Sequence, residues 1–107
     1  MNQKKQVRAK FKNDVFARDK YICQVCKKIG LEVELDAHHI TDRNEMPNGG
    51  YVLSNGITVH KDVCHMKVER FHISGGKNWE DGLHPNDLYK LIGSSKEKAI
   101  DESLKLL

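Results

Sequence analysis

Apolar residues recur near the start of the chain at the spacing of one face of a helix. Val7, Phe11, Val15 and Phe16 are separated mainly by lysine, arginine and other polar residues. This period predicts an amphipathic helix over residues 6–19, with one narrow apolar stripe that packs and other faces that are basic.

A second pattern, strict alternation, begins at Leu31. Leu31, Val33 and Leu35 alternate with acidic residues, which predicts a strand over residues 31–40. A long loop with glycine and proline follows. Two short apolar runs around a Ser-Asn-Gly turn then predict strands at residues 51–53 and 57–59.

The rest of the chain returns to helical periods. Residues 61–72 predict a helix with Cys64, Val68 and Phe71 on one side. Residues 85–93 predict another helix, with Pro85 in its first turn and Gly93 just past its end. A Ser94-x-x-Glu97 capping box opens a last helix, whose apolar face is formed by Ala99, Ile100, Leu104 and Leu107. These elements predict an α+β fold.

Composition limits the size and class of the protein. A chain of 107 residues allows one domain, and only 38% of its residues are apolar while 31% are charged. Small, lean chains often need a covalent or metal crosslink. The chain has no apolar run of about 18 residues and no secretory signal. We therefore expect a cytoplasmic protein with no membrane partner.

The three cysteines have the spacing of a metal site. Cys23-x-x-Cys26 is half of a tetrahedral zinc site, and His60-x-x-x-Cys64 offers the other half from a strand end and the next helix. A structural zinc contributes on the order of 10 kcal/mol to folding, which would compensate for the lean core. The simpler interpretation makes Cys23 and Cys26 small buried residues and His60 a surface residue.

Positive charge is concentrated in the first third of the chain. Residues 1–30 hold nine Lys and Arg and two Asp, a net charge of +7, whereas residues 31–107 have a net charge of −4. This asymmetry indicates a polyanion partner, and a solvated helix face explains it equally well. Nucleic-acid phosphates would meet six of the basic residues: Lys5, Arg8, Lys12, Lys27, Lys28 and Arg43.

Residues 18–72 resemble the HNH endonuclease family, most closely its small stand-alone phage and bacterial members. After Cys23-x-x-Cys26, the chain carries His39-Ile40, then Ser54-Asn55-Gly56-Ile57, then Cys64-His65, which is the order His, Asn, His. The resemblance implies a ββα-metal core over residues 21–72, between a basic N-terminal helix over 1–20 and a helical C-terminal extension over 73–107. His60 departs from the family, which usually has cysteine there.

The resemblance also implies a role for each motif residue. His39 matches the general base, and His38 and His65 match ligands of a catalytic divalent ion. Asn55 matches the residue that holds the loop and orients the base. The zinc ligands are matched by Cys23, Cys26 and Cys64.

The implied reaction is hydrolysis or nicking of DNA that leaves 5′-phosphate and 3′-hydroxyl ends. A general base accelerates a reaction by about 10²–10⁴-fold, too little for a phosphodiester, so a divalent ion is needed where charge develops. Mg²⁺ is one candidate, and Mn²⁺, Ni²⁺ or Zn²⁺ are others. Glu69 and His72 could complete either metal shell or simply cover their helix, and we prefer the second interpretation.

Two other functions stay open at this point. The chain could be a non-catalytic, zinc-stabilised nucleic-acid-binding module that uses the same basic helix. It could also be a component of a phage packaging complex, with residues 73–107 as the contact surface. A phage-encoded protein would act in the bacterial host cell.

Overall fold

The first apolar stripe forms helix α1, Gln3–Arg18, which buries Phe11, Val15 and Phe16. The computed structural model describes residues 3–106. The helix begins before the predicted residue 6, because its first turns are carried by lysine and glutamine, which are good helix formers. Val7 is only half-buried, so the packing stripe effectively starts at Phe11.

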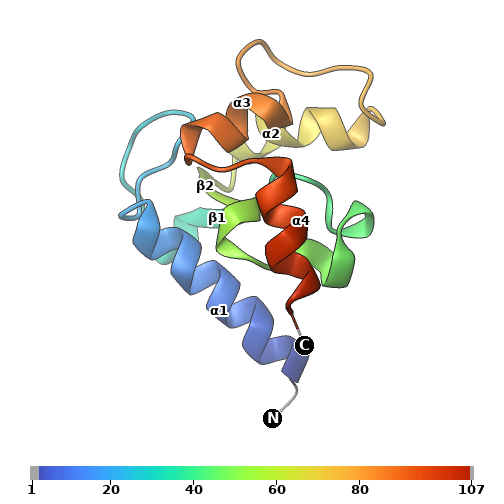
Figure 1. Ribbon diagram of the computed structural model, residues 1–107. Helices are drawn as coiled ribbons and strands as arrows, with labels where there is room; N and C mark the ends of the chain where they lie inside the picture. The colour runs from blue at the N-terminus through green and yellow to red at the C-terminus, as the bar shows by residue number, and fades with distance from the viewer. Residues whose placement is uncertain (1–2, 107) are drawn as a thin grey trace.

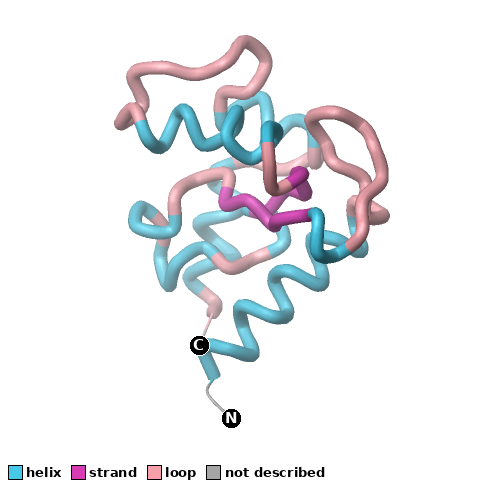
Figure 2. The backbone as a smooth tube through the Cα atoms, turned by 180° about the vertical axis from the view of Figure 1, so that it is seen from behind, coloured by secondary structure: helices cyan, strands magenta, loops and turns pink. Residues whose placement is uncertain are grey.

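A two-stranded antiparallel sheet lies between α1 and a second helix, α2 (Val63–Ile73). Strand β1 is Leu35–His39 and strand β2 is Gly56–His60. Their register pairs Leu35 with His60 and His39 with Gly56. Figure 2 shows both strands enclosed by helices on two sides.

Gly56 lets α1 cross the sheet at close range. A Cβ atom at this position would lie 2.4 Å from Val15 Cγ2 and 2.7 Å from Phe11 Cε1. No side chain fits in that space without moving the helix. The packing of α1 on the end of β2 therefore depends on this glycine.

The strand predicted over residues 31–40 is wrong in its first half. Residues Glu32–Glu34 form a 3₁₀ turn, and Leu31 and Val33 are 69% and 74% exposed. β2 ends at His60, opposite Leu35, so the alternating residues before Leu35 have no partner strand. The Glu34 carboxylate instead accepts a hydrogen bond from the Leu31 N–H group.

The strand predicted at residues 51–53 is also wrong. Leu53–Asn55 is a 3₁₀ turn that leads directly into β2. Two further 3₁₀ segments, Arg43–Glu45 and Pro47–Gly50, occupy the preceding loop. Tyr51 packs edge-on against the rings of Phe11 and His39. The short apolar run at residues 51–53 therefore reflects packing in the core and not a strand.

The C-terminal helices follow the prediction in outline. Helix α3 is Pro85–Leu91, and Gly93 after it has φ 67°, as a helix-ending glycine should. Helix α4 is Lys96–Leu104. Both helices supply residues to the core that also contains the sheet: Leu88, Tyr89 and Ala99.

Two details predicted for α4 are wrong. Its N-cap is Ser95, which accepts from the Lys98 N–H group, while the Ser94 hydroxyl donates to the Ser54 carbonyl. Leu104 is exposed and the buried position in the last turn is Ser103. Leu107, also predicted to be apolar packing, lies outside the described residues.

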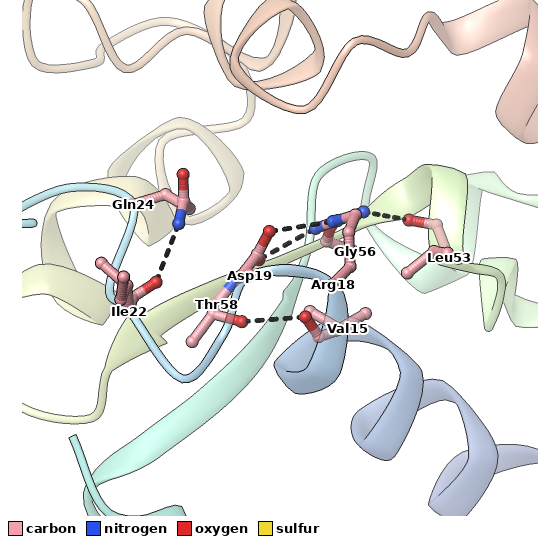
Figure 3. A network of polar contacts seen from close by, with 8 residues as sticks. All are labelled: Val15, Arg18, Asp19, Ile22, Gln24, Leu53, Gly56 and Thr58. Atoms are coloured by element: carbon pink, nitrogen blue, oxygen red, sulfur yellow. Dashed lines mark hydrogen bonds and ion pairs between the residues drawn. The ribbon is translucent and has the colours of Figure 1, made fainter. Parts of the chain in front are cut away.

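A charged pair joins the end of α1 to the sheet (Figure 3). Arg18 donates to both carboxylate oxygens of Asp19 at 2.9 Å and to the carbonyls of Leu53 and Gly56. Asp19, buried, also accepts from the Thr58 N–H group at 2.9 Å. Because each charge is hydrogen-bonded, burial is tolerated, and the segment after α1 is fixed against β2.

Of the helices in residues 3–106, none combines the length and the apolar content that crossing a membrane requires.

Candidate metal centres

Four predicted zinc ligands lie together at the end of β2. One ligand atom from each of Cys23, Cys26, His60 and Cys64 lies within 4.8 Å of the others. Cys26 Sγ is 3.2 Å from His60 Nδ1. These residues come from the knuckle, which is the segment of residues 21–30 after α1, from the end of β2 and from the first turn of α2. The predicted Cys₃His grouping is confirmed as a cluster that could hold a metal ion such as zinc.

The electrostatics of the cysteines favour a cation among them. Burial raises the pKa of the Cys23 thiol, but the N–H groups of Cys26 and His60 donate to its sulfur and have the opposite effect. The hydrogen bonds outweigh burial, and the pKa of Cys23 falls to about 6. Burial, together with the neighbouring Cys23 and Cys26 sulfurs, raises the pKa of Cys64 to about 12. Cys64 therefore resists ionisation beside another thiolate unless a positive charge offsets the repulsion.

A second ligand group lies between β1 and α2. His38, His65 and Glu69 each place one ligand atom within 4.8 Å of the others. Glu69 Oε1 is 3.1 Å from His38 Nδ1 and 3.5 Å from His65 Nε2. Glu69, for which we preferred a covering role, contacts both predicted ligands through its carboxylate, which fits the alternative role in a metal shell.

His38 is the most deeply placed member of this group. Its side chain is almost fully buried at 2% exposure; Nδ1 faces the Glu69 carboxylate at 3.1 Å, and Nε2 has no hydrogen-bond partner within the protein. Burial lowers the pKa of its imidazole, which keeps the ring neutral, the state in which histidine binds metals. A buried imidazole that faces a carboxylate at one nitrogen and leaves the other unpaired fits a metal ligand well.

His65 is held in a fixed orientation by a carboxylate on β1. Its Nδ1 lies 2.8 Å from Asp36 Oδ2, which leaves Nε2 toward Glu69. The contact with Glu69, and then Asp36, raises the pKa of His65, and hydrogen bonds from His38 and His65 lower that of Glu69. A carboxylate behind a metal-binding histidine is a common outer-shell arrangement. The sequence analysis did not include Asp36. The signal for it was its position two residues before His38, which places both side chains on the same face of β1.

His39 faces the opposite side of β1 from His38, as expected for neighbours in a strand. Its ring stacks on Phe11 with centroids 4.6 Å apart and meets Tyr51 edge-on at the same distance. Burial, followed by the charge of His38, lowers its pKa to about 4. Its Nε2 is buried without a hydrogen-bond partner in the protein. His39 is therefore a neutral imidazole with an unsatisfied nitrogen.

His72 links these histidines without joining either ligand group of the described residues. Its ring stacks on His38 at 5.3 Å, and its Nε2 donates to the His39 carbonyl at 3.0 Å. This contact ties α2 to the end of β1. The covering role preferred for His72 agrees with these contacts.

Asn55 holds the long loop between the strands. Its amide is fully buried; Oδ1 accepts from the Thr41 N–H group, and Nδ2 donates to the carbonyls of Thr41 and Gly50. Tyr89 on α3 donates its hydroxyl to the same Oδ1 at 2.7 Å. Tyr89 was missed because it lies in the extension, where its apolar spacing indicated only packing.

The six basic residues predicted to contact nucleic acid do not form one patch. Arg8 and Arg43 meet at Tyr51: the Arg8 guanidinium lies 5.4 Å over its ring, and Arg43 donates to its hydroxyl at 3.3 Å. Lys12 pairs with Glu32 instead. The exposed residues Lys27 and Lys28 lie in the knuckle beyond the C-terminal end of α1, whereas Lys5 lies on its first turns.

The two ligand groups occur in a chain that no family model, curated protein or solved structure matches. The chemistry of the two groups therefore has to be argued from their donor atoms. Three sulfurs and one imidazole form a complete tetrahedral zinc set, whereas two imidazoles and one carboxylate leave positions open for other ligands.

Proposed function

We propose that this protein is a metal-dependent endonuclease of the HNH type that hydrolyses or nicks DNA phosphodiester bonds. The observation that carries the proposal is the convergence of His38, His65 and Glu69 behind β1, with His39 on the adjacent position of the same strand. The proposal includes a ββα-metal core made of β1, β2 and α2.

The donor set suits a catalytic ion better than a structural one. Two imidazoles and one carboxylate bind Zn²⁺, Mn²⁺, Ni²⁺ or Mg²⁺ with positions to spare. Such an ion, when bound, would neutralise charge that develops on the phosphate and the leaving oxygen. The chain's own contribution is an oriented set of ligands: His38 is buried and His65 is aligned by Asp36.

His39 is proposed as the general base. A pKa of about 4 keeps the imidazole neutral at pH 7, and the buried Nε2 has no partner within the protein, so its lone pair is free to accept a proton once substrate binding brings a water molecule to it. Asn55 is proposed as a positioning residue, because its four hydrogen bonds fix the loop that carries Tyr51 against His39. Product ends would be 5′-phosphate and 3′-hydroxyl.

The second candidate is a zinc-stabilised module that binds nucleic acid without cutting it. The Cys₃His cluster and the basic first third of the chain favour this candidate. A module that only binds nucleic acid would use the cluster for folding and the basic residues for binding. It leaves the convergence of His38, His65 and Glu69 without a purpose. A role in a phage packaging complex is compatible with either candidate.

The decisive experiment incubates supercoiled plasmid with the protein and Mg²⁺, Mn²⁺ or Ni²⁺, with EDTA as the control. We expect nicking that depends on the added ion. His39→Ala should abolish nicking, while zinc content and circular dichroism stay those of the wild type. Retained nicking by His39→Ala would refute the role of the base, and a mobility shift without nicking would support the binding module.

A further inference from the structure

A cavity of about 580 Å³ opens between the first two turns of α1 and the loop that contains Arg43. These turns lie at the end of the molecule away from α2 and α3 (Figure 1). We call it the Tyr51 cavity. The residues of its lining that matter here are Lys4, Val7, Arg8, Arg43, Asn44 and Tyr51.

The lining of the Tyr51 cavity combines cationic and apolar side chains. Lys4, Arg8 and Arg43 carry positive charge, and no Asp or Glu among the described residues lines the space. Val7 and the Tyr51 ring supply apolar surface. Arginine guanidinium groups match phosphate oxygens in pairs, so this combination suits a ligand with a phosphate and a flat or apolar part.

Tyr51 connects the cavity to His39. Its ring lies under the Arg8 guanidinium at 5.4 Å, and its hydroxyl accepts from Arg43. The same ring meets His39 edge-on, with centroids 4.6 Å apart. A ligand in the cavity is therefore separated from the proposed general base by one aromatic ring.

The size of the cavity selects the form of the ligand. Pockets for single small molecules span about 300–1,000 Å³, a range that contains this cavity and matches one nucleotide better than a base pair with its neighbours. Taking a nucleotide out of a duplex costs a few kcal/mol, and least where the strand is already unpaired. The cavity therefore favours a single strand.

We propose that the Tyr51 cavity binds one unpaired nucleotide of a DNA strand, with its phosphate between Arg8 and Arg43. This proposal rests on the proposed nuclease function and specifies its substrate class: single-stranded DNA, or duplex with frayed or unpaired nucleotides beside the cleavage point. Tyr51 and Val7 contact the base or sugar of that nucleotide.

The test measures binding of a fluorescein-labelled oligothymidylate and of a duplex of equal length, at physiological ionic strength and without added divalent ion. Arg8→Ala and Arg43→Ala should each weaken oligothymidylate binding by about tenfold, the expected size for losing a charge-assisted hydrogen bond. Duplex binding should change less. Lys77→Ala and Lys90→Ala, which remove the same charge at exposed positions after α2 and on α3, serve as matched controls.

Asn44→Trp tests the cavity itself, because it fills the space at an exposed position without changing charge. It should weaken oligothymidylate binding as much as the arginine variants do. Inorganic phosphate, added as competitor, should displace the strand only weakly if the nucleotide's base and sugar contribute. Full displacement by phosphate at low concentration overturns the proposal in favour of a simple anion site.

Equal losses in the lysine controls, or wild-type binding by Asn44→Trp, also overturn the cavity proposal. Plasmid nicking, measured on the same preparations, separates this result from the nuclease proposal. Nicking without the arginine-dependent binding removes only the cavity assignment. Arginine-dependent binding without nicking by the wild type removes only the nuclease assignment.

Discussion

The two ligand groups each include one of two neighbouring residues of α2, Cys64 and His65, and they differ in their donor atoms and in the segments that supply them. Cys64 joins the group made by the knuckle and the end of β2, whereas His65 joins the group on β1. The first offers three sulfurs and an imidazole from three chain segments. The second offers two imidazoles and a carboxylate from one strand and two turns of one helix.

Under the proposed function, the first group would hold the fold together and the second would leave an ion accessible. A complete soft donor set that crosslinks distant segments makes folding depend on the metal. A smaller, harder set on two elements that already pack does not, and it keeps coordination positions open. One helix turn can thus serve both purposes, because successive residues point in different directions.

The largest expected effect comes from removing one sulfur ligand. Cys26→Ser should abolish the cooperative fold, since a structural zinc contributes about 10 kcal/mol or more, comparable with the whole stability of a domain. Circular dichroism during heating and zinc analysis measure this. Cys26→His, which leaves a Cys₂His₂ set, should keep both zinc and a cooperative transition. A Cys26→Ser variant that melts like the wild type would show that the cluster is not a structural site.

The next effect concerns the second group alone. Glu69→Gln should reduce ion-dependent plasmid nicking by more than about 100-fold, because losing a ligand costs more than losing its outer-shell partner. Zinc content and melting temperature should change little. Arg70→Gln, one residue further along α2 and exposed, is the matched control. Equal nicking by both variants would remove Glu69 from the catalytic group.

A smaller effect is expected from the residue behind His65. Asp36→Asn should weaken Mn²⁺ binding by about 10–100-fold in calorimetry, because the amide no longer holds the His65 ring as its carboxylate does. Asp62→Asn, an exposed change just before α2, should leave the affinity unchanged. If both variants bind Mn²⁺ like the wild type, His65 needs no such orientation.

The smallest predicted effect tests the link between the extension and the loop. Tyr89→Phe should lower the free energy of unfolding by about 1–3 kcal/mol, because Asn55 Oδ1 and the Thr41 hydroxyl both lose a buried partner. Urea denaturation measures the change. Tyr21→Phe, at a ring that is 38% exposed, should have almost no effect. Similar losses in the two variants would contradict the role of the buried network.

The sequence predicted some elements well and others poorly, for physical reasons. The four helices were predictable because a helix satisfies its own hydrogen bonds, so period and caps are local signals. The strand over residues 31–40 was overextended because alternation says nothing about where a partner strand ends. Leu31 and Val33 keep the pattern, but β2 stops opposite Leu35.

The candidate sites show the same division. The spacing of Cys23, Cys26, His60 and Cys64 was enough to predict one cluster, since the chain has only three cysteines and all three belong to it. Glu69 was undervalued because a helical glutamate four residues after a histidine is common on solvated surfaces. Its place beside His38 depends on how α2 packs against β1.

The amino-acid sequence by itself determined the α+β composition of the fold, the soft ligand set and the concentration of positive charge near its start. Only the tertiary structure brought Asp36 to His65, Glu69 to His38, Tyr89 to Asn55, and Arg8 and Arg43 to Tyr51. The physical reason is range: hydrogen bonding within a helix and ligand spacing act over a few residues. These other contacts join separate segments, so they arise only when those segments pack together.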